Sequence, residues 1–174
     1  MITRHDMFEP LLEALPAFRP QWEAFVVEWK DNPNNTFVED PRDLPNYLLL
    51  GDLADYLADL LLAGQVEDVS RALAVCERWL LEGDHYVQEA AAVGLIEDLQ
   101  NRAQRLNIAE ERFTELFGPE GRRWWDKVNA FWSKGELLVD ETKLSPPERA
   151  QWELVDKPFS LAHFRWLQTL FKRK

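Results

Sequence analysis

The chain has 174 residues and a formal net charge of −11, from 31 acidic and 20 basic side chains. Hydrophobic residues make up 46% of it, which excludes a disordered chain, since disorder goes with too little apolar surface to offset the ordering entropy. The negative charge argues against nucleic acid as a ligand, and the single cysteine, Cys76, excludes an intrachain disulfide and a CxxC metal site. The length suits one domain that covers residues 1–174.

The N-terminal part of the chain is predicted to contain two helices and a loop. A short helix is predicted over residues 9–15, and a second helix that begins at Pro20 carries apolar residues at i, i+3, i+4 and i+7. Residues 34–46 are polar and contain prolines, which predicts a loop. The most apolar segment, residues 48–62, is interrupted by three Asp, and no signal peptide is recognisable, so we expect a cytoplasmic protein without a membrane span.

The central part of the chain is predicted to be three consecutive helices. They cover residues 47–63, 66–82 and 84–106, with Gly64 and Gly83 in the two short turns. Helices of this length joined by such turns are typical of a HEAT-like antiparallel stack. We therefore predict an all-α fold, a single domain of antiparallel helices with a HEAT-like helical stack in its central part.

The helix predicted over residues 66–82 is amphipathic. Cys76 lies in the middle of its apolar face and is predicted to be a small buried hydrophobe, not a reactive thiolate. The opposite face predicts two i, i+4 ion pairs, Glu67–Arg71 and Arg78–Glu82.

The helix predicted over residues 84–106 begins with Asp84 as its N-cap. Ala90 and Gly94 are small and lie one turn apart, which favours close approach of a second helix, so this element is predicted to be the central one. Glu97 lies on the same side, where a partly covered carboxylate either bonds to neighbouring donors or serves a partner.

The remainder of the chain is predicted to hold two further helices before an irregular segment. A short helix is predicted over residues 109–117, and the next begins after Gly118 and ends near Gly135. The Trp124, Trp125 and Trp132 face of the latter helix is predicted to be core. The predicted core thus spans residues 46–135. It is followed by an irregular excursion over residues 136–158 and a final helix over residues 159–171.

The acidic residues concentrate in the first 100 positions. Residues 1–100 carry 20 acidic and 6 basic side chains, a net charge of −14, whereas residues 101–174 have a net charge of +3. This asymmetry indicates either a surface that steers a cationic partner or a solvated acidic surface. The candidates for partner binding are three Asp at i, i+3 and i+7 and acids near the turns and on the central helix: Asp52, Asp55, Asp59, Glu82, Asp84, Glu97 and Asp98.

The sequence contains no recognisable catalytic motif. None of the three His has a second His or Cys at metal-ligand spacing, and neither GxGxxG nor GxxxxGK[ST] occurs. Carboxylates on one helix face leave a divalent metal enzyme as an alternative, although the Glu-x-x-His pairs of helical di-iron proteins are missing. We predict no catalytic residue, no metal and no cofactor.

Two stretches of the sequence resemble a known family. They contain EGD at 82–84 with GLIEDLQN at 94–101, and FGPEGRRWWD at 117–126 with Phe131-Trp132. These motifs are similar to those of an uncharacterised family of small, acidic, all-helical bacterial proteins, some of them encoded among polymorphic-toxin and immunity genes. The resemblance covers residues 45–135. It implies an all-α fold and a role in toxin neutralisation, and it supplies no catalytic motif.

The function expected from these observations is protein binding. We expect an immunity-type protein that neutralises a basic toxin or effector domain through an acidic surface, because the substrate grooves of nucleases are basic. Two alternatives stay open, a nucleic-acid-mimicking inhibitor of another bacterial or phage system and a carboxylate-metal enzyme. Neither nucleic acid nor a membrane is expected as a partner. The loops at 34–46 and 136–158 are alternative contact regions.

Overall fold

The computed structural model describes residues 1–38, 43–136 and 138 of the chain. Their regular structure is helical, and this confirms the predicted all-α class. Most of the predicted excursion at 136–158 and all of the predicted helix at 159–171 lie outside the described residues. The elements are α1 (Phe8–Ala14), the 3₁₀ turn η1 (Pro16–Phe18), α2 (Arg19–Trp29), α3 (Asn46–Leu62), α4 (Val66–Glu82), α5 (His85–Glu89), the π-helical segment η2 (Ala90–Ile96), α6 (Glu97–Leu106), α7 (Glu111–Thr114) and α8 (Pro119–Lys134).

Contacts between residues divide the chain into two units, Met1–Asn129 and Ala130–Lys174. The described part of the second unit is the last turn of α8 and the residues that follow it. There the Phe131 and Trp132 rings meet edge to face at 5.1 Å, and Gly135 adopts a positive φ of 72° where the helix ends. The prediction of a single domain over the whole chain stays a prediction.

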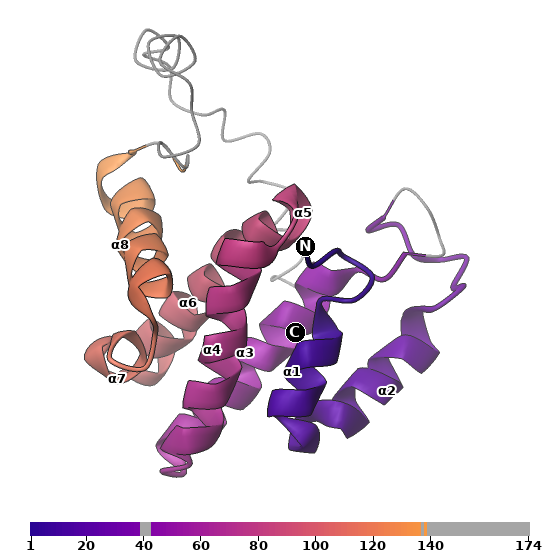
Figure 1. Ribbon diagram of the computed structural model, residues 1–174, viewed down its shortest axis with the longest axis horizontal. Helices are drawn as coiled ribbons and strands as arrows, with labels where there is room; N and C mark the ends of the chain where they lie inside the picture. The colour runs from indigo at the N-terminus through magenta and orange to yellow at the C-terminus, as the bar shows by residue number, and fades with distance from the viewer. Residues whose placement is uncertain (39–42, 137, 139–174) are drawn as a thin grey trace, which may run out of the picture. The chain divides into compact units, whose positions relative to one another are not determined.

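Three helical segments form the centre of the first unit: α3, α4 and the continuous run of α5, η2 and α6. α3 packs against α4, η2 and α6, and α4 packs against α5 and η2 (Figure 1). The turn between α3 and α4 is short because Gly64 takes the left-handed conformation, with φ of 80°, as predicted for a glycine at a helix C-terminus. The predicted three-helix packing of residues 46–106 is confirmed, whereas its HEAT-like character stays a prediction.

The helix predicted over residues 84–106 differs from expectation in its middle. It divides into α5, η2 and α6, and the wider π-helical turns occupy Ala90–Ile96. This segment contains Gly94, which has a poor preference for α-helical geometry. A Cβ atom on Gly94 would lie 2.7 Å from Cδ1 of Leu50, so the absence of a side chain at Gly94 permits α3 to approach closely. This agrees with the close approach predicted from Ala90 and Gly94.

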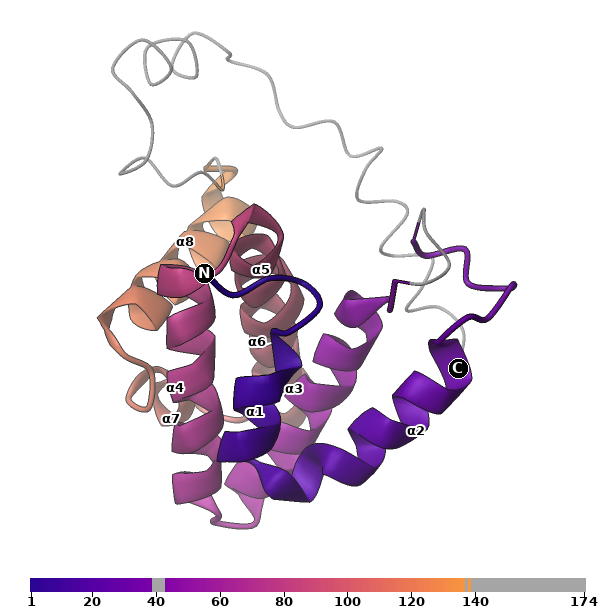
Figure 2. The same ribbon diagram turned by 45° about the vertical axis from the view of Figure 1, so that its right-hand side comes forward.

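The N-terminal residues complete the core on the side of α4. α1 lies beside α4 in both views (Figure 2), and the buried Trp79 donates its indole N–H to the carbonyl oxygen of Met7 at 2.9 Å. Phe8 stacks on Trp22 of α2, with ring centroids 5.0 Å apart. In the stripe predicted for α2, Phe25 is buried and the other apolar residues are half-buried.

An isolated parallel bridge joins Ile2 to Gly83. The Ile2 N–H donates to the Glu82 carbonyl at 2.9 Å, and the Ile2 carbonyl accepts the Asp84 N–H at 2.8 Å. Gly83 is extended here, and a Cβ atom on it would lie 2.4 Å from the Trp79 carbonyl oxygen. The glycine is therefore required by this close approach and not by a left-handed conformation. No helix in the described part of the chain is both long and apolar enough to cross a membrane.

Candidate functional site

The Asp trio predicted along α3 does not form a continuous acidic stripe. Asp52 and Asp59 lie on exposed turns, whereas Asp55 between them is half-buried. The Asp55 carboxylate contacts Arg102 Nε and lies 2.9 Å from Arg105 Nη2, both on α6. The Asp55 side chain stays 46% exposed, but two arginines of the neighbouring helix pair with its charge, so it differs from the other two Asp.

Asp98 lies next to this ion pair and is buried, with 8% of its surface exposed. Its carboxylate faces Gly51 of α3, where an added Cβ atom would be 3.3 Å from Asp98 Oδ2. Burial raises the pKa of Asp98 to about 6, and the charge of Asp55 contributes, while Arg102, Asn101 and Arg105 act in the opposite direction. We call Asp55, Asp98, Arg102 and Arg105 the α3–α6 charge cluster.

The acids around Gly83 have different surroundings. Glu82 is exposed and pairs with Arg78 at 3.3 Å, which confirms the predicted i, i+4 pair. Asp84 is the N-cap of α5, as predicted, and accepts the Val87 N–H at 2.9 Å. Its carboxylate therefore has a structural role whatever else it contacts.

The other predicted i, i+4 pair is wrong. Arg71 pairs with Asp68, one turn before it, instead of Glu67, and its Nε donates to the Ala14 carbonyl oxygen at 3.0 Å. The second bond directs the guanidinium toward the end of α1. Glu97, the remaining predicted site residue, is half-buried in the first turn of α6.

The end of the α3–α4 hairpin combines acidic and apolar side chains. Leu62 and Val66 are exposed by 53% and 41%, although both are apolar. Asp59 precedes them by one turn of α3, and Glu67 follows in the first turn of α4; both are exposed. We call Asp59, Leu62, Val66 and Glu67 the α3–α4 tip. Apolar residues that are exposed within a polar rim occur at protein-binding surfaces.

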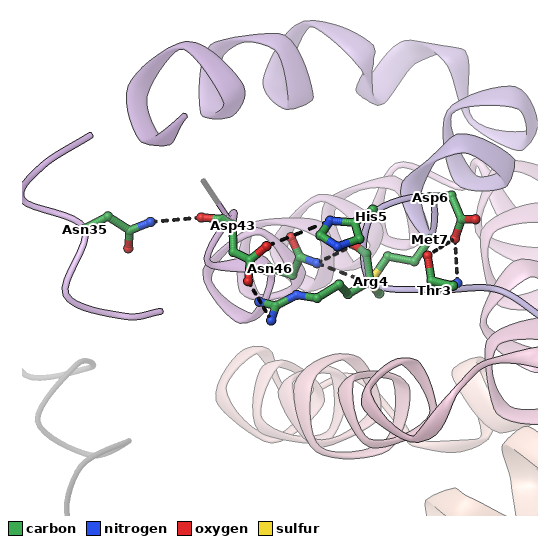
Figure 3. Close-up of polar contacts among 8 residues, drawn as sticks. All are labelled: Thr3, Arg4, His5, Asp6, Met7, Asn35, Asp43 and Asn46. Carbon is green, nitrogen blue, oxygen red and sulfur yellow. Dashed lines mark hydrogen bonds and ion pairs between the residues drawn. The ribbon is translucent and has the colours of Figure 1, made fainter. Parts of the chain in front are cut away.

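A polar cluster that the sequence did not predict holds the N-terminal segment in place (Figure 3). Arg4 pairs with Asp43 at 2.9 Å and lies 4.5 Å above the ring of Tyr86. The buried Asn46 donates to the Arg4 carbonyl oxygen at 3.0 Å and to Met7 Sδ at 3.5 Å. These residues are far apart in sequence, and no local pattern marks them as partners.

Glu77 is a second residue whose role sequence reasoning missed. Its two carboxylate oxygens accept the backbone N–H groups of Glu120 at 2.8 Å and of Gly121 at 2.6 Å, at the start of α8. Gly118 also lies against this carboxylate, because a Cβ atom there would be 2.5 Å from Glu77 Cδ. The FGPEG sequence is thus explained as a helix start built around a carboxylate from α4. Gly118 and Gly121, on either side of Pro119, are the sequence feature that could have indicated this helix start.

Metal-ligating side chains and the cysteine are the remaining candidates for chemistry. Within residues 1–38, 43–136 and 138, no group of three or more His, Cys, Asp or Glu side chains is placed to hold a metal ion. Asp55, whose charge acts on Asp98, is paired with two arginines. The buried Cys76 has a pKa raised by desolvation, with a smaller contribution from Glu77.

Comparison with known proteins supports an uncharacterised family. A family described as a domain of unknown function (DUF7674) matches residues 8–133. The matched region therefore includes α1 and α2, whereas the resemblance seen in the sequence covers only residues 45–135. Neither the curated proteins nor the solved structures gave a match.

Proposed function

We propose that this chain, which belongs to the DUF7674 family of domains of unknown function, is a non-catalytic binding protein of the immunity type. In this proposal it binds a basic toxin or effector domain in the cytoplasm and covers the basic surface with the acidic end of its α3–α4 hairpin. The observation that carries the proposal is the α3–α4 tip, where Leu62 and Val66 are exposed between acidic side chains.

The charge of the hairpin region supports a cationic partner. Residues 46–89 contain nine acidic and two basic residues, a net charge of −7, and α3 has three Asp and no Lys or Arg. Three arginines from later in the chain offset part of this charge: Arg102 and Arg105 pair with Asp55, and Arg112 donates to the Leu61 carbonyl oxygen. Because Asp55 is neutralised by α6, the acids best placed to act on a partner are Asp59 and Glu67 at the tip, with the exposed Asp52 two turns away. Such charges raise the association rate, and salt screens them over about 8–10 Å at physiological ionic strength.

The exposed apolar residues supply a different part of the binding energy. Leu62 and Val66 lie four positions apart across the turn, so that one partner surface can cover both. Burial of apolar side chains stabilises a complex after it has formed and therefore slows its dissociation. The tip thus combines acids that act on association with apolar residues that act on dissociation.

The proposal is tested by capturing the partner and measuring how it binds. The chain is used to capture proteins from its source, and a captured basic protein is then expressed in a host with and without the chain. We expect the captured protein to inhibit growth and the chain to relieve the inhibition. We also expect association of the purified proteins to slow as salt concentration rises, and the D59K/E67K variant to associate more slowly.

A matched variant separates the tip from net charge. E23K/E28K makes the same change in charge on exposed positions of α2 and should have a smaller effect than D59K/E67K. A captured partner that lacks a basic surface, or equal effects of the two variants, would contradict the proposal. Inhibition of a nucleic-acid-binding enzyme without toxicity would favour the alternative of a nucleic-acid mimic.

A further inference from the structure

We propose that the α3–α6 charge cluster is a pH-sensitive latch, in which protonation of Asp98 strengthens the packing of α6 against α3 and ionisation weakens it. The inference is independent of the binding function proposed above.

Asp98 is buried where α6 packs against α3. Its carboxyl group lies in the contact between two helices, with only 8% of the residue exposed, and it faces the backbone of α3 at Gly51. The absence of a side chain at Gly51 provides the space for this carboxyl group. An ionised carboxylate loses most of its hydration here, and that loss is unfavourable unless other groups compensate it.

The positive charges of Arg102 and Arg105 act on two carboxylates, Asp55 and Asp98. Arg102 and Arg105 both contact the same oxygen of Asp55, Oδ1, across the helix contact. The groups that act on Asp98 are these two arginines and Asn101 from α6, together with Asp55 from α3. When Asp98 is ionised, two negative groups compete for the arginines. When Asp98 is protonated, both arginines remain with Asp55.

Protonation of Asp98 favours the folded state. Burial raises the pKa of Asp98 to about 6, with a further contribution from Asp55, whereas an unfolded chain has an Asp pKa of about 3.9. The folded state therefore binds the proton more tightly than the unfolded state does. The stabilisation that results is complete below the unfolded pKa and is lost as pH rises through about 6.

The main test compares unfolding of wild type and Asp98→Asn at two pH values. The asparagine side chain has the shape of the protonated carboxyl group, so the variant should be more stable than wild type at pH 7.5. This advantage, expressed as the ratio of the two folding equilibrium constants, should be about tenfold smaller at pH 5.0 than at pH 7.5. Asp59→Asn, an exposed position on α3, is the matched control and should show no such change.

Direct titration of Asp98 keeps the proposal falsifiable even when a variant does not fold. In wild type, the Asp98 carboxyl carbon followed by NMR should titrate near pH 6. The protection factors of amides in α3 and α6, which are exchange rates corrected for the intrinsic effect of pH, should rise as pH falls through that midpoint. Asp55→Asn removes the like charge and should lower the midpoint. An Asp98 midpoint below pH 4.5, or an equal advantage of Asp98→Asn at both pH values, would overturn the proposal.

Discussion

Glu77 accepts the backbone N–H of Gly121 at 2.6 Å and so caps a helix that begins more than 40 residues further along the chain. The same carboxylate accepts the Glu120 N–H through its other oxygen. A negative charge at this position also interacts favourably with the N-terminal end of the α8 dipole. The bond therefore connects α4 to the sequence that defines the start of α8.

Glu77→Ala should destabilise the fold by about 1–2 kcal/mol, because it removes the cap of two N–H groups and a favourable charge at the helix end. Glu77→Gln keeps one acceptor oxygen and should lose less. The measurement is urea-induced unfolding at neutral pH. Glu67→Ala is the matched control on the exposed face of α4, and an equal loss in the two alanine variants would contradict the capping role.

Cys76 provides a test of core placement. Its side chain is fully buried, and burial raises the pKa of its thiol, so a thiol reagent should modify the native protein far more slowly than the unfolded protein. Cys76→Asp should cost several kcal/mol, on the order of 3 or more, because it buries a charge without a partner. Cys76→Ala is the control and should lose much less. Rapid modification of the native thiol would show that the placement is wrong.

Glu110 accepts the indole N–H of the buried Trp125 at 3.0 Å, and the Asn129 side chain donates to the same oxygen. Glu110→Ala should therefore cost about 1–3 kcal/mol, since it leaves a buried donor without its acceptor. The loss should appear in thermal unfolding and in the tryptophan fluorescence of the folded state. Glu111→Ala changes the next residue, which is exposed, and a similar loss there would argue against the bond to Trp125.

Arg4 combines an ion pair to Asp43 with a contact to the face of Tyr86. Arg4→Ala should cost about 1 kcal/mol, and Arg4→Lys should restore only part of it, because lysine keeps the charge but not the planar group. Unfolding in urea and amide exchange at Ile2 would measure the effect. Arg19→Ala, an exposed position in α2, should change stability little. Complete rescue by Arg4→Lys would show that the charge alone accounts for the stabilisation, without the planar contact to Tyr86.

The sequence predicted the parts of this fold that depend on neighbouring residues. Helical spacing predicted the bounds of α4, and Gly64 and Asp84 were identified at the turns because their preferences are local. Short-range ion pairs were predicted less well. Arg78 pairs with Glu82 as predicted, but Arg71 pairs with Asp68 and not with Glu67. The reason is that the Arg71 Nε–H group donates to the Ala14 carbonyl oxygen at the end of α1, which directs the guanidinium away from Glu67.

The parts that could not be predicted depend on which helix faces meet. No local pattern predicts that Asp55 is paired, because its arginine partners are about 50 residues away, on another helix. Glu77 and its glycine partners are similarly distant. Asp98 belongs to the GLIEDLQN motif, but its burial follows from the contact of α6 with Gly51, which the spacing of α3 residues alone does not reveal.

The bonds of the N-terminal segment have a consequence for the order in which the chain folds during synthesis. Met7 and its partner Trp79 are 72 residues apart, and at about 5–20 residues per second the ribosome takes roughly 4–14 s to add the second after the first. Glu82 and Asp84, which pair with Ile2, follow later still. During this interval, the first residues of the chain have none of these partners. Closing so long a loop also carries an entropic cost, so the N-terminal segment should dock late, after α3 and α4 have paired.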